Sequence, residues 1–304
     1  MTTGFGGAKG PQLRSGRADR PAFFPVNHPA YRLFSLRMKR ASSKAKLTPE
    51  AVLAGLKTRL FGRSLLCLDK TTSTNDVLLE LAGQGASEGT TVTAETQTQG
   101  RGRQGRGWFQ AQGKGLAFSI LLRPKLQPDE LSEITLAAAV AVAMTLEDFG
   151  FKPRIKWPND LLLEGRKVCG ILTEMGPKKD KMTCVVLGIG VNINHGSRDF
   201  PGELKGTATS LFKISGRKIK RSKFLQKLLN HLEETYRWVS DRRFSRVLVE
   251  WRKRTVTLGK QVKVTQGHRS FYGQVTDIDE KGALLVRNDI GIIEKVTSGD
   301  VTEI

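Results

Sequence analysis

Glycine and arginine alternate through one short stretch of the chain, Gly100-Arg101-Gly102-Arg103-Gln104-Gly105-Arg106-Gly107-Trp108. Glycine lets the backbone approach a ligand closely and adopt positive φ. Arginine offers a fixed fork of donors that matches carboxylates and phosphates. This composition predicts a loop that closes over an anion.

The glycine spacing of this loop fits several kinds of anion site. Gly100, Gly102 and Gly105 match the GxGxxG pattern, but a dinucleotide-binding fold needs a helix directly after the loop. Leu116–Leu122 is strand-like instead, so that interpretation fails. A kinase-type glycine loop does lie between strands, yet no DFG or HRD sequence follows. Taken alone, the loop also fits a mobile basic arm that contacts RNA.

Three further segments carry polar side chains where apolar strands begin or end. Lys156-Trp157-Pro158-Asn159-Asp160 ends a strand in a Trp-Pro step, which places Asn159 and Asp160 at the strand end. Lys167 begins an apolar strand and can neutralise a carboxylate or a phosphate. Gly188–Asn194 contains two glycines that permit a flat ligand to approach. Each segment also has an ordinary interpretation: a turn, a solvated lysine and a strand with a bulge.

Hydrophobic spacing predicts the elements that position these residues. We expect helices over residues 48–62, 73–81, 128–149, 222–240 and 244–251. We expect strands over residues 64–68, 90–95, 116–122, 154–157, 167–175 and 182–194, with a turn over residues 176–180 between the last two. From about Thr255 the spacing changes to short alternating strands, over residues 261–265, 273–278, 283–287 and 291–295. The predicted fold class is α+β, followed by a small antiparallel barrel.

The charge of the chain is uneven. Its 304 residues carry a formal net charge of +21, of which residues 1–47 supply +9 through ten basic residues and one acidic residue. We therefore divide the chain into a basic disordered tail (1–47), an α+β body (48–254) and a barrel (255–304). Two interpretations of the tail stay open: translation starting at Met38 behind an inert segment, or a targeting or nucleic-acid-binding segment.

The cysteine and histidine spacings exclude several classes of protein. Cys67, Cys169 and Cys184 are isolated and odd in number, which favours reduced thiols in the cytoplasm over a disulfide framework. The four histidines have no metal-ligand spacing, so we expect no protein-bound metal centre. No apolar run is long enough to span a membrane, and we expect no membrane partner.

In this order and spacing, the polar segments resemble those of biotin protein ligases. The resemblance covers residues 65–304 and rests on Ser73-Thr74-Asn75, Gln97, Gly100–Gly105, Lys156–Asp160, Lys167 and Gly188–Asn192. It implies a mixed or antiparallel central sheet with helices packed on it, of the class II synthetase type, and an SH3-like C-terminal barrel. It also implies a ligase that uses biotin, ATP and Mg²⁺. The partner would be the biotin carboxyl carrier protein or domain of a biotin-dependent carboxylase.

The resemblance also assigns roles to individual residues. Ser73, Thr74 and Asn75 would bind the ureido end of biotin, because hydroxyls and an amide suit a urea. Gln97 would add a contact there. The backbone and side chains of Arg101-Gly102-Arg103 would fold over the adenylate phosphate.

The remaining roles concern charge. A carboxylate and a triphosphate must approach one another, so cations are needed to offset their repulsion. Arg101, Arg103 and Lys167 would supply them together with Mg²⁺. Asn192 would contact ATP, and Asn159-Asp160 would help to position Mg²⁺ or the incoming lysine.

The sequence also departs from some biotin protein ligases. Residues 1–47 are too few and too irregular for a helix-turn-helix domain, so we expect a monofunctional ligase without specific DNA binding. Because the chain ends at Ile304, we expect it to lack late residues that contact the adenylate in longer relatives. The oligomeric state stays open, a homodimer included. Two alternatives also remain: a lipoate or octanoate ligase of the same fold, and an RNA-binding protein.

Overall fold

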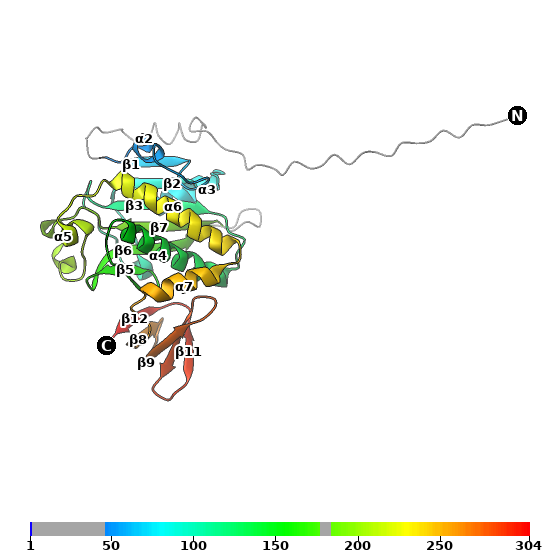
Figure 1. Cartoon of the computed structure of the whole chain (residues 1–304), viewed down its shortest axis with the longest axis vertical. Helices are drawn as coiled ribbons and strands as arrows, with labels where there is room; N and C mark the ends of the chain where they lie inside the picture. The colour runs from blue at the N-terminus through cyan, green and yellow to red at the C-terminus, as the bar shows by residue number, and fades with distance from the viewer. Residues whose placement is uncertain (2–45, 177–183) are drawn as a thin grey trace.

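The computed structural model describes Met1 and residues 46–176 and 184–304 (Figure 1). Nearly all of the expected tail, and most of the turn expected over residues 176–180, lie outside the described residues. Two residues assigned to the tail nevertheless pack on the body. Lys46 forms an ion pair with Asp69, with Nζ and Oδ1 2.5 Å apart. Leu47 is buried, and its backbone N–H donates to the carboxylate of Glu95.

A seven-stranded sheet forms the centre of the molecule, in the order β1-β2-β3-β7-β6-β5-β4. Strands β1 and β2 are parallel and every other neighbouring pair is antiparallel, so the predicted mixed sheet is confirmed. Strand β3 is buried along its whole length, because both faces of the sheet are covered. The strands are β1 (Leu65–Thr71), β2 (Thr91–Gln97), β3 (Leu116–Leu122), β4 (Arg154–Lys156), β5 (Asp160–Leu163), β6 (Arg166–Met175) and β7 (Val185–Val191).

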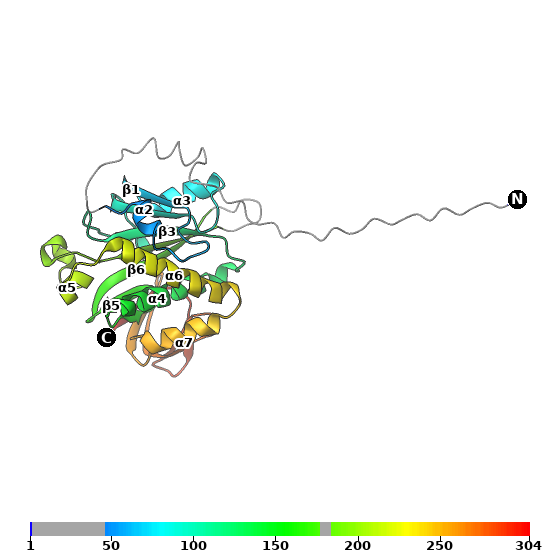
Figure 2. The same ribbon diagram turned by 45° about the horizontal axis from the view of Figure 1, so that its top comes forward.

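Three helices cover one face of this sheet: α4 (Leu131–Asp148), α6 (Arg221–Ser240) and α7 (Phe244–Arg254) (Figures 1 and 2). The run of small residues in α4 lets it pack closely between the sheet and α6, and most of the helix is buried. Helix α3 (Thr74–Gly83) contacts β2, β3 and β7 and belongs to a separate apolar cluster. Alternate residues of β3 divide between the two clusters, as the pleat of a strand requires.

The first helix is much shorter than its sequence predicts. Thr48 caps it as expected, but α2 (Pro49–Leu53) ends nine residues before Gly62. Its last carbonyls accept hydrogen bonds from the Gln226 side chain of α6. A Cβ on Gly55 would lie 2.8 Å from that same side chain, so the chain turns away here. Contacts with α6 therefore override the helical spacing.

One strand and one α-helix of the body were absent from the prediction. Strand β5 forms a hairpin with β6 across Glu164-Gly165, both of which have positive φ. A Glu-Gly step directly after the apolar run Leu161–Leu163 was the signal for it. Helix α5 (Leu211–Ser215) is a single short helix, capped by Ser210 and ended by Gly216 in the left-handed region.

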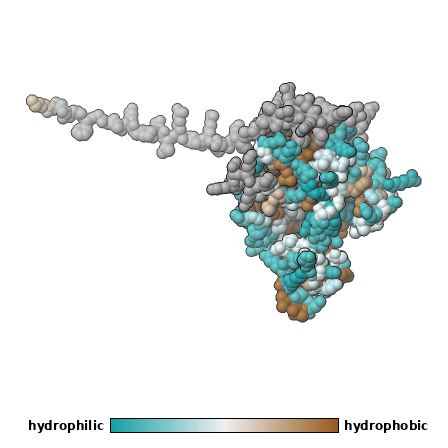
Figure 3. Space-filling model, turned by 180° about the vertical axis from the view of Figure 1, so that it is seen from behind, coloured by the Kyte–Doolittle hydropathy of each residue, from teal (hydrophilic) through white to brown (hydrophobic). Residues whose placement is uncertain are grey.

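The C-terminal segment forms a five-stranded antiparallel sheet in the order β11-β10-β9-β8-β12. The predicted small barrel is confirmed, and it gains a fifth strand that the sequence analysis missed. Ile290 and Ile292, between β10 and β11, and Ile293, at the start of β11, are exposed. Figure 3 shows apolar surface at the end of the barrel away from the body. The strands are β8 (Gln261–Gln266), β9 (Arg269–Ile278), β10 (Leu284–Asn288), β11 (Ile293–Val296) and β12 (Asp300–Glu303).

The barrel is joined to the body directly beside the predicted Lys156–Asp160 segment. The indole Nε1 of Trp157 donates to the carbonyl of Gly282, 3.1 Å away, and its backbone N–H donates to Thr257. The peptide bond between Trp157 and Pro158 is cis. Within the described part of the chain, no helix has the length and apolar character needed to cross a membrane.

Candidate active site

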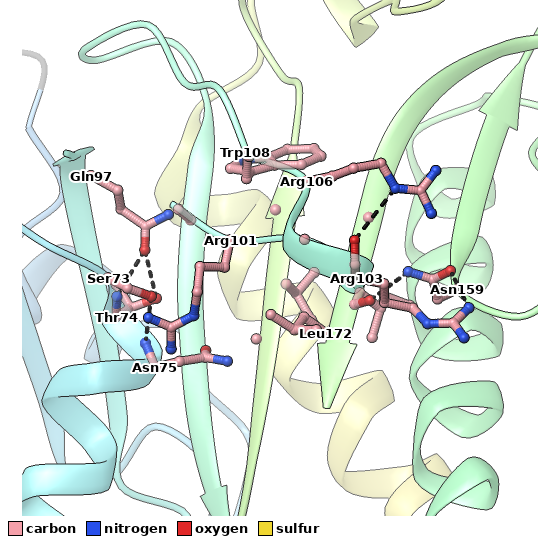
Figure 4. A pocket seen from close by; sticks show the side chains of 18 of the residues that line it. Ser73, Thr74, Asn75, Gln97, Arg101, Arg103, Arg106, Trp108, Asn159 and Leu172 are labelled. Carbon is pink, nitrogen blue, oxygen red and sulfur yellow. Dashed lines mark hydrogen bonds between the residues drawn. The ribbon is translucent and has the colours of Figure 1, made fainter. Parts of the chain in front are cut away.

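One pocket brings most of the predicted polar residues together. It lies between the start of α3, the sheet strands and the glycine-arginine loop (Figure 4). The predicted residues that line it are Ser73, Thr74, Asn75, Gln97, Arg101, Gly102, Arg103, Asn159, Asp160 and Lys167. Asn192 is buried beyond the end of β7 and is not among the lining residues.

One end of the pocket, here called the uncharged end, is built on the neutral side chains of Ser73, Thr74, Asn75 and Gln97. The Gln97 side-chain oxygen accepts from the backbone N–H of Thr74 at 2.8 Å and from its hydroxyl at 3.1 Å. Ser119 lies 2.6 Å from the Thr74 hydroxyl and donates to the Asn75 side-chain oxygen at 2.5 Å. Ser73 is the N-cap of α3 and accepts from the backbone N–H of Asn75. These groups hold one another in place and present donors and acceptors to the cavity.

Ser119 belongs to this network but was not predicted. It is fully buried in β3, within an otherwise apolar strand, Leu116–Leu122. A hydroxyl in such a strand needs a partner, since an unsatisfied buried polar group is costly. That mismatch was the available signal in the sequence.

Arg101 extends from the loop across this uncharged end and contacts two carboxylates. Its guanidinium lies 2.6 Å from Asp76 on α3 and 3.1 Å from Glu174 on β6. Glu174 also accepts a hydrogen bond from the Asn75 amide at 2.5 Å. Partial burial lowers the pKa of Arg101, but its hydrogen bonds with both carboxylates outweigh this and raise the pKa overall. Neither carboxylate was predicted, although an acid inside the apolar strand β6 was a signal for Glu174.

The opposite end of the pocket is cationic. Arg103 donates to the Asn159 side chain at 3.4 Å and, among the described residues, forms no ion pair with a carboxylate. Burial lowers its pKa and Arg106 lowers it further, whereas the charges of Asp300 and Asp160 partly oppose the shift, and the guanidinium remains charged. Arg106 forms an ion pair with Asp300 of the barrel at 2.7 Å. Figure 4 shows Arg103 and Arg106 on the side away from Ser73 and Asn75.

Lys167 lies at the start of β6, as predicted, and faces Asp160 of β5. Its Nζ is 2.6 Å from the Asp160 carboxylate. The same ammonium is 6.0 Å from the centroid of the Trp108 ring, within range of a cation–π contact. The hairpin of β5 and β6 thus places a lysine and an aspartate at the pocket wall. An anionic ligand could share this lysine with Asp160.

Glycines let the Trp108 indole lie against the floor of the pocket. A Cβ on Gly190 would lie 2.2 Å from the indole, and one on Gly170 would lie 3.1 Å from it. A Cβ on Gly188 would collide with the Asn75 amide at 2.4 Å. The strand glycines were predicted to admit a flat ligand, and in the structure the side chains of Trp108 and Asn75 lie against them instead.

The donor set at the cationic end is compatible with magnesium that arrives with a phosphate ligand. Asp160 is the one carboxylate among the described residues that line the pocket. The described residues contain no group of three or more metal-ligating side chains. Mg²⁺ bound to nucleotides commonly takes one or two protein carboxylates, with phosphate oxygens and water as its other ligands. Asp160, beside the Asn159 amide, fits that pattern.

Two family models match the chain, and their boundaries follow the two parts of the structure. The biotin/lipoate A/B protein ligase family matches residues 67–192, and the biotin protein ligase C-terminal domain matches residues 257–302. The first includes the whole glycine-arginine loop and the strands that carry Lys167. The second includes nearly all of the small barrel.

Individual relatives agree with these models. The bifunctional ligase/repressor BirA of Bacillus spizizenii is 40% identical over 257 residues, 84% of this chain and 79% of that protein. The biotin–[acetyl-CoA-carboxylase] ligase of Mycobacterium tuberculosis is 32% identical over 277 residues, 86% of this chain and 99% of that protein. The structure of the Aquifex aeolicus biotin protein ligase in complex with biotin and ATP aligns with a TM-score of 0.69 at 32% identity. That alignment covers 79% of this chain and 98% of the other.

The fold and the pocket define a ligase with a mixed sheet and a C-terminal SH3-like barrel. The chain belongs to the biotin protein ligases of the biotin/lipoate A/B protein ligase family. The resemblance found in the sequence motifs is confirmed.

Proposed function

We propose that this protein activates biotin with ATP as biotinyl-5′-AMP and transfers the biotinyl group to a lysine of a biotin carrier domain. The observation that carries the proposal is the polarity of the pocket in Figure 4. A neutral hydrogen-bonding end, built on Thr74, Asn75 and Gln97, adjoins a cationic end, built on Arg103 and Lys167. Biotin itself has this polarity, with a neutral ureido ring at one end and a carboxylate at the other.

The first step brings two anions together. A carboxylate oxygen of biotin bonds to the α-phosphorus of ATP while the bond from that phosphorus to the bridging oxygen breaks, and pyrophosphate leaves. Lys167 is placed to offset the repulsion between the reacting groups, and Arg103 to hold the phosphate. Asn159 and Asp160 would hold Mg²⁺, which stabilises charge on the phosphate oxygens when bound.

The second step needs no nucleophile from the ligase. The neutral amine of the carrier lysine attacks the acyl carbon of biotinyl-AMP, an amide bond forms, AMP leaves with the electrons of the broken C–O bond, and the nitrogen releases one proton to water. A loop ordered over the adenylate limits its hydrolysis. The glycines of residues 100–107 allow that loop to open for the carrier.

The same assignment indicates the acceptor of the biotinyl group and the compartment in which the protein works. Relatives named biotin–[acetyl-CoA-carboxylase] ligase support a carrier domain of a biotin-dependent carboxylase as the acceptor. The three cysteines are free thiols, which supports a reducing compartment such as the cytoplasm. The prediction that the protein does not bind an operator concerns residues 1–47, of which 2–45 lie outside the described residues. That prediction and the oligomeric state remain to be tested.

A paired labelling assay tests the function. The protein is incubated with ATP, a carrier domain and either biotin or lipoate, and the product is measured by mass spectrometry. We expect an adduct with the mass of a biotinyl group, dependent on ATP, and biotin-dependent exchange of pyrophosphate into ATP. A lipoyl adduct without a biotinyl adduct would replace the proposal with a lipoate ligase. The absence of both adducts and of exchange would refute a ligase.

A further inference from the structure

We propose that Arg101 is a positioning residue that clamps the loop over the uncharged end of the pocket, through Asp76 and Glu174. This inference rests on the proposed function, because that end is where the ureido ring of biotin would lie. Arg101 and Arg103 then have different roles, although they are only two residues apart in the sequence. The clamp differs from the phosphate contact that the sequence analysis assigned to both.

The contacts of Arg101 tie three elements together. One side of the guanidinium lies 2.6 Å from Asp76 in the first turn of α3, which also accepts a hydrogen bond from Thr72. The other side donates to both oxygens of Glu174 on β6, at 3.1 and 3.3 Å. Figure 4 shows Arg101 crossing the space beside Thr74 and Asn75. The loop is therefore fastened to both walls of the uncharged end.

Charge argues against a phosphate contact for this arginine. One guanidinium between two carboxylates leaves the cluster with a net negative charge, so an anion placed there would be repelled. A neutral ring that donates and accepts hydrogen bonds meets no such repulsion. Arg103 has the opposite setting, because among the described residues it has an amide partner and no carboxylate pair.

The clamp also fixes the orientation of the Asn75 amide. Ser119 donates to its oxygen, and its nitrogen donates to Glu174. Glu174 therefore contacts both Arg101 and a residue of the predicted ureido site. Closure of the loop and orientation of Asn75 depend on the same carboxylate.

Arg101 lies at the base of the loop, so the clamp also places the rest of it. Arg101 and Gly107 form an antiparallel bridge, and the backbone N–H of Gly102 donates to the carbonyl of Arg106 at 2.6 Å. The loop thus folds back on itself as one unit. Fastening Arg101 holds Arg103 and Arg106 toward the cationic end.

Charge-neutralising variants of the two carboxylates separate a clamp from a phosphate contact. Asp76→Asn and Glu174→Gln are compared with Glu80→Gln, an exposed acid on the same helix that bonds only to the Gln84 side chain among the described contacts. We expect Asp76→Asn and Glu174→Gln each to raise the Kd for biotin about 3- to 10-fold, with the KM for ATP changed less than about twofold. Isothermal titration with biotin alone and pyrophosphate exchange provide the two readouts. Glu80→Gln should match the wild-type protein in both.

The opposite pattern would overturn the clamp. If Arg101 binds phosphate, Asp76→Asn frees it, so the KM for ATP should fall while biotin affinity stays the same. A double variant, Arg101→Gln with Asp76→Asn, adds a second check. We expect it to weaken biotin binding no more than Arg101→Gln alone, because both changes remove one interaction, whereas additive losses would contradict the clamp. Failure of the proposed function would appear separately, as a wild-type protein that neither binds biotin nor exchanges pyrophosphate.

Discussion

At the scale of single residues, the pocket separates charge from neutral hydrogen bonding. Thr74 and Gln97 bond with neutral partners at one end, where Asn75 bonds to Ser119 and to Glu174, while Lys167 and Arg103 lie at the other. Each cation differs in how much its charge is already compensated. Lys167 faces Asp160, whereas Arg103 has only an amide partner among the described residues. Substitutions at these two positions should therefore have different consequences.

Replacing Arg103 with glycine should loosen the hold on biotinyl-AMP and leave the fold intact. Among the residues that the structure describes, its guanidinium donates only to Asn159, at 3.4 Å, so a ligand phosphate can take up its remaining donors. A charge-assisted hydrogen bond contributes about 1.5–3 kcal/mol, so adenylate release should accelerate about 10- to 100-fold. Rapid filtration of preformed, radiolabelled adenylate measures this rate. Arg106→Gly is the matched control and should have a smaller effect, because Arg106 is more exposed and pairs with Asp300. Equal release from the Arg103 variant and the wild-type protein would rule out the assigned role.

Replacing Lys167 with alanine should abolish adenylate formation more than it weakens folding. The Lys167 side chain lines the pocket from the β5–β6 hairpin, and its ammonium is only partly buried. Loss of a preorganised cation at reacting anions typically costs about 100- to 1000-fold in rate. Pyrophosphate exchange measures the rate, and thermal unfolding should show a small change in Tm. Arg166→Ala, on the preceding residue and paired with Glu164 outside the pocket, is the control. A wild-type exchange rate in Lys167→Ala would remove Lys167 from the mechanism.

At the scale of elements, α6 determines the shape of the chain that precedes the sheet. Its Glu233 carboxylate accepts the backbone N–H groups of Arg59, Leu60 and Phe61. The Gln226 side chain, two turns earlier on α6, binds the end of α2. One helix face thus replaces the hydrogen bonds that residues 54–62 would have made as a helix.

Replacing Glu233 with alanine should destabilise the protein without changing the site. Three backbone donors lose their acceptor, and Phe61 is fully buried. Leaving a buried donor unpaired costs about 1–3 kcal/mol, so we expect unfolding free energy to fall by about 2–3 kcal/mol. Urea denaturation measures this, and the KM for biotin should stay the same below the transition. Glu234→Ala, on the exposed neighbouring position, should be nearly neutral. A neutral Glu233→Ala would mean that water replaces the carboxylate.

At the scale of the whole molecule, the small barrel contacts the segments that form the pocket. Trp157, two residues before Asn159, donates a hydrogen bond to the carbonyl of Gly282 in the barrel. Asp300 of the barrel pairs with Arg106 of the loop. The barrel therefore contacts both segments that form the cationic end of the pocket.

The start of α4 lies at this junction and contains a buried acid. Ser132 donates to the carbonyl of Lys281 in the barrel, and the adjacent Glu133 is buried. Burial raises the pKa of Glu133 to about 7, with a further increase from Glu130, while Arg242 and Lys281 oppose the shift. The folded protein thus holds this proton more tightly than the unfolded chain does. Its contribution to stability is greatest at low pH and is lost as the pH rises toward and through 7.

Glutamine at position 133 should therefore stabilise the protein in a pH-dependent manner. The neutral amide avoids the cost of burying a charge, which the wild-type protein meets above pH 7. We expect a gain on the order of 1 kcal/mol at pH 8, a few degrees in Tm, and much less at pH 5. Differential scanning calorimetry at both pH values measures it, with Glu130→Gln as the comparison, because Glu130 is a neighbouring acid that already pairs with Arg242. An equal shift at both pH values would assign the effect to packing.

Local sequence determined most of the elements. The Thr48 and Ser73 caps, the apolar run of β3 and the spacing of α6 appear where expected, because caps and periodic burial are encoded within a few residues. The motifs of residues 73–75, 97, 100–108 and 156–167 also identified the family. These polar and glycine-rich motifs could be recognised from the sequence alone.

Only the tertiary structure decided how these residues are paired. Asp76 and Glu174 lie far apart in the chain, yet both contact Arg101, and Ser119 joins Thr74 to Asn75 across two elements. Long-range contacts also ended α2 early. Such pairings depend on strand order and register, which local spacing does not specify. The sequence therefore predicted an anion-binding loop, and the folded chain placed Arg101 between two carboxylates and left Arg103 without an ion pair among the described residues.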